Sequence, residues 1–539
     1  MLSGWLENYA ELLQEFGARA ADDPTPDDVD LLLALCQRDG PAALGRIRGP
    51  LAAIVWEPVL ARLTAIRDHL GESAVCFAGG PGLLMLASEE AALLRHPAVS
   101  TEPDLGWLGR FAARMPLPPG RTAFRDIAEL SPGEQCQWHH QSLRRSRVPA
   151  VLPAGLDREP DRRVCATRWR EAFAAGIPPA TRRGRQFGLM LSGGMDSTTV
   201  AAFGVPAIRA SGRDVAAYCW RLDRFPEGDE SPAIRDVASR VNVRVNWFSG
   251  DDLYPVLDPE SWPACPNLPQ LNPFLGLNLA AYEAARSAGC DVVLNGHLGD
   301  YLYPHRYHGL ADALRVGNWQ QGSREWRELT RRFGLAGCWR APDIRWFIKL
   351  FLKVRPRQIP PPYLAAPALR HFEKIEPWPP ESEQAPHPAQ WSNLFGTTSA
   401  MEMKYERYFA SRAGIERRHP LRHQRILETV LALPGFLFFD PKRDKALTRD
   451  AMQGLLPDHV VHGVPGGNLS ELFLHGVFRA GLPATRALLS NPGALWPEIV
   501  SRGYVNAALQ AGPAAGAEQQ RVLIAATGME LWRHAIGRR

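Results

Sequence analysis

Apolar residues recur in two different patterns along the chain, and the change between them divides it in two. Between about residues 40 and 100, short apolar runs are separated by Gly and Pro. Such runs predict β-strands joined by turns, and they lie at 51–56, 63–66, 74–77 and 83–86. The first part of the chain is therefore predicted to be mostly β.

Longer apolar runs and helical periodicity take over from residue 187. Uninterrupted runs at 187–191, 215–219 and 291–294 are typical of strands that are buried on both faces of a parallel sheet. Helical patterns lie between them, at 231–240 and 275–288. Strands that alternate with helices predict a doubly wound α/β sheet.

Three further segments complete the outline. Pro, Gly and charged residues fill 148–163 and predict a linker, so we expect a first domain at 1–150 and a second at 160–539. The segment 377–390 is rich in Pro, Glu and Gln and is expected to be a surface loop. From residue 397 to the end, the pattern is largely helical.

Composition and charge exclude several classes of protein. No apolar run approaches the roughly 20 residues that a transmembrane helix needs, and the first residues resemble no secretory signal, so we expect no membrane span and a cytoplasmic protein. The net charge of +5 is small for 539 residues and the arginines are scattered, which argues against a nucleic-acid partner. The eight cysteines form no CxxC pair or zinc-type cluster, as expected of reduced thiols.

The segment 191–199, Leu-Ser-Gly-Gly-Met-Asp-Ser-Thr-Thr, has the features of a pyrophosphate-binding loop. It follows a predicted strand and opens a predicted helix, so that N–H groups, the helix N-terminus and hydroxyl groups would face an anion. The six lysines of the chain all lie elsewhere, so this is not a Walker-type loop. The residues expected to bind nucleotide here are Leu191, Ser192, Gly193, Gly194, Asp196 and Ser197.

Two acidic side chains are candidates for a metal site. Asp196 needs a cation between itself and a phosphate, so we expect it to hold Mg²⁺. The alternative is an ordinary glycine-rich turn whose acid stabilises the helix dipole. A second loop, 294–300, follows another parallel strand, so its Gly296 and Asp300 should reach the same crevice, where Asp300 could share the metal. Taken alone, this loop is a simple turn.

His297 lies between the two glycines of the second loop. A neutral imidazole in that position can take a proton from an attacking amine near neutral pH. The alternative is a loop histidine that only makes structural hydrogen bonds. We predict the base role.

These motifs resemble the synthetase domain of the asparagine synthetase superfamily, which includes β-lactam synthetases and the macrolactam synthetases of lasso peptides. The similarity extends through 414–420, 431–434, Lys445 with Arg449, and 454–457. The first domain looks like the superfamily's glutaminase half, at 49–56, 67–71, 87–89 and 131–133. The resemblance implies a degenerate Ntn-glutaminase-like, β-rich domain, followed by an adenine nucleotide α-hydrolase-like domain (a PP-loop ATP pyrophosphatase) with a helical C-terminal part.

The chain also departs from the family pattern. Glutamine-hydrolysing members use an N-terminal cysteine, whereas this sequence starts with Met1 and has its first cysteine at Cys36, so we expect that glutamine is not its nitrogen source. The family's lysine after the Leu-Pro helix is absent from 460–467. Lys445, Arg449 or His462 would have to replace it, or the enzyme would be slow or inactive.

The position of His297 resembles that of a tyrosine which helps to deprotonate the amine in β-lactam synthetases. A carboxylate that orients His297 would come from the helix before Pro420, where Glu402 and Glu406 are candidates. Either glutamate could instead be a solvated helix charge. The family's Pro-Phe-Leu-Asp is altered to Pro-Leu-Arg-His at 420–423.

The resemblance implies an ATP- and Mg²⁺-dependent ligase of lasso peptide biosynthesis. It would adenylate an Asp or Glu side chain of a ribosomal precursor peptide and close an isopeptide ring with the peptide's N-terminal amine. A leader-peptide-binding protein and a leader peptidase would act beside it. The alternatives are small-molecule amide formation, as in β-lactam or ammonia-dependent asparagine synthesis, and a degenerate scaffold that binds nucleotide or peptide.

Overall fold

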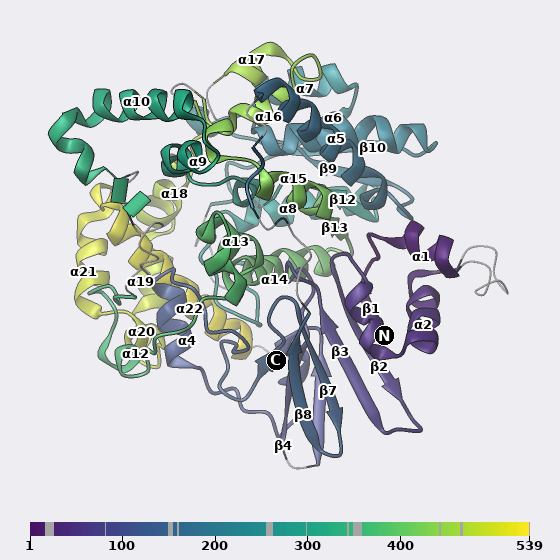
Figure 1. Ribbon diagram of the computed structural model, residues 1–539. Helices are drawn as coiled ribbons and strands as arrows, with labels where there is room; N and C mark the ends of the chain where they lie inside the picture. The colour runs from purple at the N-terminus through teal and green to yellow at the C-terminus, as the bar shows by residue number, and fades with distance from the viewer. Residues whose placement is uncertain are drawn as a thin grey trace.

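Two antiparallel sheets form the N-terminal domain (Figure 1). The five-stranded sheet has the order β1-β2-β3-β7-β8 and the three-stranded sheet the order β5-β4-β6. Their strands are β1 (Leu2–Gly4), β2 (Leu51–Glu57), β3 (Arg62–Arg67), β4 (Cys76–Gly80), β5 (Leu83–Ala87), β6 (Ala128–Glu129), β7 (Glu134–His139) and β8 (Ser142–Arg147). The computed structural model describes residues 1–16, 26–80, 82–148, 153, 155–158, 161–254, 262–297, 299–341, 344–345, 347–348, 358–440, 443–463 and 467–537.

Alternate side chains of β2 pack on opposite faces of the larger sheet and so contact two different layers. Ala53 and Val55 pack against α1 (Tyr9–Phe16) and α2 (Asp28–Asp39). Ala52 lies in a second cluster with side chains of the three-stranded sheet. Because successive side chains of a strand point to opposite faces, the larger sheet is covered by helices on one side and by the smaller sheet on the other.

The second sheet system is a five-stranded parallel sheet in the order β11-β10-β9-β12-β13. Its strands are β9 (Phe187–Met190), β10 (Val215–Arg221), β11 (Arg244–Ser249), β12 (Val292–Leu294) and β13 (Glu416–Arg418). One core cluster joins one face to α5 (Arg162–Ala180), α6 (Met195–Ala210), α7 (Ser231–Val241), α15 (Gln424–Ala432) and α16 (Ala446–Ala451). Another joins the opposite face to α8 (Leu275–Ser287) and α14 (Thr397–Arg412), so the sheet is doubly wound.

The position of β9 determines where a ligand can enter. The chain continues from β9 to β10 on one side and later adds β12 on the other. A point where the strand order reverses in this way opens a crevice at the carboxyl ends of the strands. The loops after β9 and β12 flank that crevice.

Helices complete the molecule and join its two halves. Trp532 of the last helix packs on Phe124 of the N-terminal domain, with ring centroids 5.2 Å apart, inside a core that both halves share. The remaining helices are α3 (Glu90–Leu93), α4 (Leu105–Ala112), α9 (Gly309–Arg315), α10 (Trp319–Gly337), α12 (Ala366–Arg370), α13 (Pro388–Phe395), α17 (Asp458–His462), α18 (Ser470–His475), α19 (Leu482–Leu489), α20 (Trp496–Ile499), α21 (Arg502–Ala511) and α22 (Ala517–Gly537).

The predicted fold class is confirmed, with local differences. The strands β11 and β13 were not predicted from the pattern. The expected surface loop at 377–390 contains a short 3₁₀ helix and the start of α13, and its His387 is buried against Asp312 at 2.6 Å. Much of the predicted linker, and Leu298 of the second loop, lie outside the described residues. In the described part of the chain, no helix is both long and apolar enough to cross a bilayer.

Candidate functional site

The loop after β9 turns directly into α6 and is held by its own hydroxyl groups. Leu191 is buried at the end of the strand, and Gly194 is the N-cap of the helix. Ser192 Oγ lies 2.8 Å from Ser197 Oγ and accepts a bond from the Gly194 N–H at 3.2 Å. A Cβ at Gly193 would lie only 3.2 Å from α7. This compact turn places the positive end of the α6 dipole at the crevice.

The loop after β12 packs on the first loop so closely that two of its positions require glycine. A Cβ at Gly296 would lie 2.6 Å from the Ser197 nitrogen, and one at Gly299 would lie 2.4 Å from Asp196 Cγ. Real Cβ atoms almost never approach other atoms so closely. The structure therefore brings together the two loops that the sequence predicted to share one crevice.

The variant Gly299→Ala tests this contact. Its methyl group would overlap the Asp196 carboxylate and push the two loops apart, so we expect affinity for ATP, measured by calorimetric titration, to fall at least about tenfold. The control is Gly503→Ala on α21, where the new methyl group would come no closer than an ordinary contact of 3.8 Å with Ser501 Oγ. If the Gly299 variant bound ATP as tightly as the control, close packing of the loops would not matter for the nucleotide.

Asp196 and Asp300 converge on a single cation. Lys445 Nζ lies 2.7 Å from Asp196 Oδ2 and 2.5 Å from Asp300 Oδ1. Burial raises the pKa of Asp196, and the Lys445 ammonium opposes that rise. Burial alone would lower the pKa of Lys445, but the two carboxylates raise it. The two acids predicted as metal ligands therefore lie close enough to share one positive ion.

The donor set at this point fits Mg²⁺. This ion requires oxygen ligands and is usually held by one or two carboxylates together with substrate phosphates. The Asp300 side chain is 79% exposed and can meet a ligand from the crevice, whereas that of Asp196 is 15% exposed. Asp196 and Asp300 would hold the metal, which would supply positive charge against a phosphate group.

His297 faces a buried carboxylate on α14. Its Nε2 lies 4.0 Å from Glu406 Oε1, and its backbone N–H donates to Asn295 Oδ1 at 3.1 Å. Glu406 is also bound by Tyr282 Oη at 2.6 Å and by Asn278 Nδ2 at 3.0 Å. Burial would raise the pKa of Glu406, but His297 and the bond from the Tyr282 hydroxyl hold it below its usual value. The glutamate is therefore an anion in contact range of the imidazole.

Glu402 lies one helical turn before Glu406, on the same side of α14. It accepts a bond from Tyr301 Oη at 3.0 Å, and burial raises its pKa although His297 opposes the rise. The alternative that these glutamates are solvated helix charges is wrong for Glu406, which is 3% exposed. Glu406 accepts a bond from Asn278 of α8, and α8 and α14 pack on the same face of the sheet.

Several residues of the site were missed by the sequence reasoning. Tyr303 donates to Asp196 Oδ1 at 3.4 Å, and its ring lies 5.2 Å from Lys445 Nζ. Asn278 and Tyr282 hold Glu406. The sequence could have indicated this pair, because Asn278 and Tyr282 are polar residues four positions apart on a predicted helix whose other residues are mostly apolar.

Of the three candidates to replace the expected lysine, Lys445 has the suitable position. Arg449 is buried and donates to three main-chain carbonyl oxygens. His462 is exposed at the end of α17, and 464–466 lie outside the described residues. Only the Lys445 ammonium, among these three, contacts Asp196 and Asp300.

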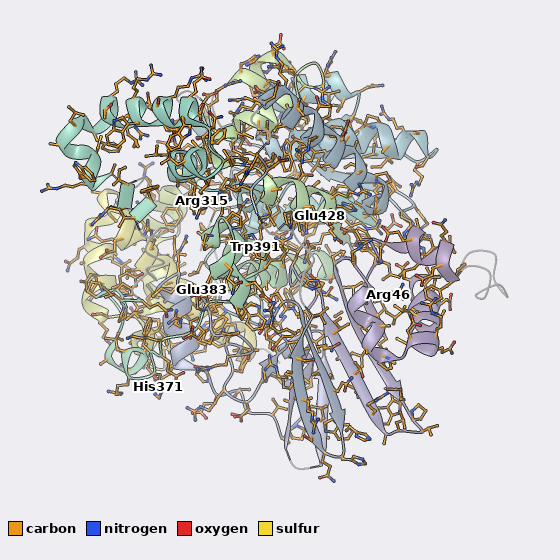
Figure 2. The ribbon with its side chains drawn as sticks, viewed as in Figure 1. Arg46, Arg315, His371, Glu383, Trp391 and Glu428 are labelled. Atoms are coloured by element: carbon orange, nitrogen blue, oxygen red, sulfur yellow. The ribbon has the colours of Figure 1, made fainter. Side chains whose placement is uncertain are left out.

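A cavity of about 550 Å³ lies between the N-terminal domain and the segment 419–428 of the second domain. Two of its lining residues, Arg46 and Glu428, are labelled in Figure 2. His419 also lines it, and the ring centroid of His419 lies 6.4 Å from that of His297. The cavity therefore reaches the histidine neighbour of the candidate base.

Glu7 in the wall of this cavity makes stability depend on pH. Burial raises its pKa to about 8, although the Gln424 N–H lowers it. Below its ordinary pKa of 4.5, the Glu7 carboxyl is protonated in both the folded and the unfolded protein. As the pH rises from there towards 8, the unfolded protein loses this proton while the folded protein keeps it, so the free energy of unfolding falls. We expect Glu7→Gln to raise the melting temperature at pH 9 and leave it unchanged at pH 4. Equal shifts at both values would contradict this origin.

Comparisons with known proteins agree with this arrangement. Residues 168–534 match the family model described as asparagine synthase, and residues 1–148 match a glutamine amidotransferase domain. Relatives in Mycobacterium bovis and Mycobacterium tuberculosis that carry the name "Putative asparagine synthetase [glutamine-hydrolyzing]" are 27% identical over 317 residues. The match covers 56% of this chain and 47% of each relative, so the chain spans about half the length of these curated proteins.

Solved structures give a weaker likeness. A glutamine phosphoribosylpyrophosphate amidotransferase from B. subtilis, in complex with ADP and GMP, is 11% identical with a TM-score of 0.22, over 56% of this chain and 70% of that one. An allosteric regulatory enzyme of purine biosynthesis is 12% identical with the same TM-score, over 49% and 61%. Neither likeness carries an argument about this protein.

Proposed function

Because this chain belongs to the asparagine synthase family, we propose that it is an ATP-dependent ligase that closes a macrolactam ring on a lasso-type precursor peptide. ATP would adenylate an Asp or Glu side chain of the peptide, with release of pyrophosphate. The peptide's free N-terminal amine would then attack the acyl adenylate, with release of AMP. We also propose domains at 1–150 and 160–539, which the ranges of the two family matches support.

The first half-reaction would use the two loops at the crevice. Backbone N–H groups of the loop after β9 and the α6 dipole would bind the pyrophosphate portion of ATP. Mg²⁺, when bound, would neutralise the triphosphate charge between Asp196 and Asp300. Lys445 would turn from its carboxylate partners to the departing pyrophosphate, where its ammonium would stabilise the negative charge that develops.

The pair formed by His297 and Glu406 is the observation that carries the second half-reaction. The imidazole would take a proton from the N-terminal amine as it attacks the acyl adenylate, and the anionic Glu406 would stabilise the imidazolium that forms. Holding the amine and the activated carboxyl of one peptide in the same crevice removes most of the entropic cost of the encounter.

The thiols in the N-terminal domain are not activated as nucleophiles. Burial raises the pKa of Cys36 to about 11 and that of Cys136 to about 11, and it also raises that of Cys76. A nucleophilic cysteine needs a lowered pKa to supply thiolate at neutral pH. These three cysteines of residues 1–148 are therefore poor nucleophiles.

ATP–pyrophosphate exchange with different carboxylates tests the proposal. We expect exchange that depends on a leaderless precursor peptide. A leader-peptide-binding protein and a leader peptidase are the proposed partners. Exchange with aspartate or another small amino acid would favour small-molecule amide formation, which the names of the mycobacterial relatives support. ATP binding without exchange for any carboxylate would favour a nucleotide- or peptide-binding scaffold.

A further inference from the structure

Helix α14 presents opposite faces to the candidate site and to the N-terminal domain. Glu402 and Glu406 are four residues apart and share the face that meets His297. Lys404 lies two residues from each, about 200° around the helix, and so points the other way. Its Nζ contacts two carboxylates of the N-terminal domain, Glu90 Oε1 and Glu129 Oε2, each at 2.5 Å.

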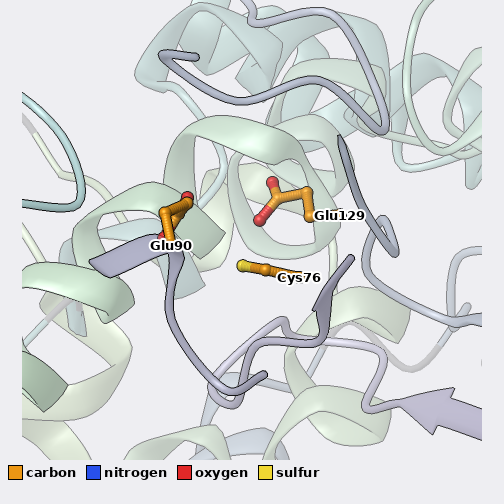
Figure 3. Close-up of side chains that lie close together, drawn as sticks. All are labelled: Cys76, Glu90 and Glu129. Atoms are coloured by element: carbon orange, nitrogen blue, oxygen red, sulfur yellow. The ribbon is translucent and has the colours of Figure 1, made fainter. Parts of the chain in front are cut away.

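The partners of Lys404 form a cluster that looks like a metal site but is already neutralised. Glu90, Glu129 and Cys76 point toward one another, with potential ligand atoms within 4.8 Å (Figure 3). Lys404 occupies the place that a cation would take, and Arg67 Nη1 lies 3.2 Å from Glu129 Oε2. Burial would lower the pKa of Lys404, but the two glutamates raise it, so its ammonium keeps its charge. The cluster therefore joins two parts of the chain.

A third buried glutamate of the N-terminal domain, Glu72, holds the segment that follows α14. Glu72 is 6% exposed and lies 2.9 Å from Arg422 Nε and 3.0 Å from His419 Nδ1. Arg417 also lies 3.5 Å from Glu72 and donates to the main-chain oxygen of Met403 in α14 at 2.8 Å. The domain thus contacts α14 directly and through the next strand.

We propose that the N-terminal domain positions α14 for ring closure, and that Lys404 is the positioning residue through which it does so. This inference rests on the proposed function of His297 and Glu406. Buried ion pairs demand exact partners and often add little net stability, so their clearest effect is geometric. The 4.0 Å separation between His297 and Glu406 is the quantity that a displaced α14 would change.

The test replaces Lys404 and its two carboxylate partners with neutral side chains of similar size, Lys404→Met with Glu90→Gln and Glu129→Gln. Arg67 loses the Glu129 carboxylate in this variant but keeps its bonds to the main-chain oxygens of Leu130 and Gly71. Lys404→Met alone would leave two buried carboxylates without their partner and could unfold the protein. We expect the triple variant to keep ATP–pyrophosphate exchange within about twofold of the native protein, while ring closure falls at least about tenfold. The KM for the peptide in the exchange assay should change little, because the variant slows ring closure and not peptide binding or adenylation.

The control is Arg147→Met with Glu381→Gln, an ion pair that also joins β8 of the N-terminal domain to the later chain but does not touch α14. It should leave exchange and ring closure unchanged. A triple variant whose two activities fell in equal proportion, or whose ring closure stayed at the native rate, would overturn the positioning role.

Hydrogen exchange separates this inference from the proposed function. Amides of α14 should exchange faster in the triple variant than in the native protein and the control, whether or not a peptide substrate is known. If the native protein closes no ring but α14 is loosened in the triple variant, the proposed function fails while the positioning of α14 stands. Unchanged protection of α14 would refute the positioning role by itself.

Discussion

Asp196→Ala is expected to reduce ATP–pyrophosphate exchange at least about 10³-fold, a loss typical of removing a central electrostatic group. Its carboxylate lies at the first turn of α6, against Gly299, and within 2.7 Å of Lys445 Nζ. Without it, the metal would lose a ligand and Lys445 would lose the partner that sets its position. Asp300→Ala should act in the same direction, because Asp300 completes the pair.

The control for both variants is Asp236→Ala. Asp236 lies on α7, 60% exposed, and its recorded ion pair is with the exposed His459. Its loss should leave exchange at the native rate. Exchange that survived in the Asp196 variant would show that this carboxylate does not hold the metal, and the loop would then be a glycine-rich turn that only begins a helix.

His297→Ala is expected to separate the two half-reactions. Exchange should continue, since adenylation does not need a base for the amine, while ring closure should fall by about 10²–10⁴-fold, the usual contribution of a positioned base. Glu406→Gln should show the same separation with a smaller loss, because glutamine can still accept the bond from Tyr282. Single-turnover assays that follow AMP and cyclised peptide separately would measure both effects.

His459→Ala is the matched control for the base. This histidine is 56% exposed on α17, on a different element from His297. It should leave both half-reactions unchanged. If the His297 variant closed rings at the native rate, the base would have to be sought elsewhere in the crevice.

The parts of the fold that could be predicted are those whose sequence carries its own pattern. Apolar strands such as β9 and β12 are buried on both faces, and the glycines of their loops mark tight turns. The strand β13 could not be found in this way, because its three residues are Glu416, Arg417 and Arg418. It forms because it pairs with β12, because the buried Glu72 carboxylate lies against Arg417, and because the main-chain oxygen of Ala180 accepts a bond from Arg418.

The candidate site was predictable to a similar degree. The loops suggested Asp196, Asp300 and His297, and the structure brings the two aspartates together on Lys445. The environment of Glu406 was not readable, since a glutamate on a helix looks solvated until α8 is placed against it. The role of Lys404 was equally hidden, because its partners are distant in the sequence. Glu90 lies 314 residues before it, and the second partner, Glu129, is also a buried carboxylate of the N-terminal domain.

One reaction tests the central claim most directly. The protein would be incubated with ATP, Mg²⁺ and a leaderless precursor peptide encoded beside its gene, and the products followed by mass spectrometry and nucleotide chromatography. We expect equal amounts of AMP, pyrophosphate and a peptide lighter by one water, with an isopeptide bond between its N-terminal amine and an Asp or Glu side chain. Formation of ADP and phosphate, or of AMP with a peptide that stays linear, would contradict it.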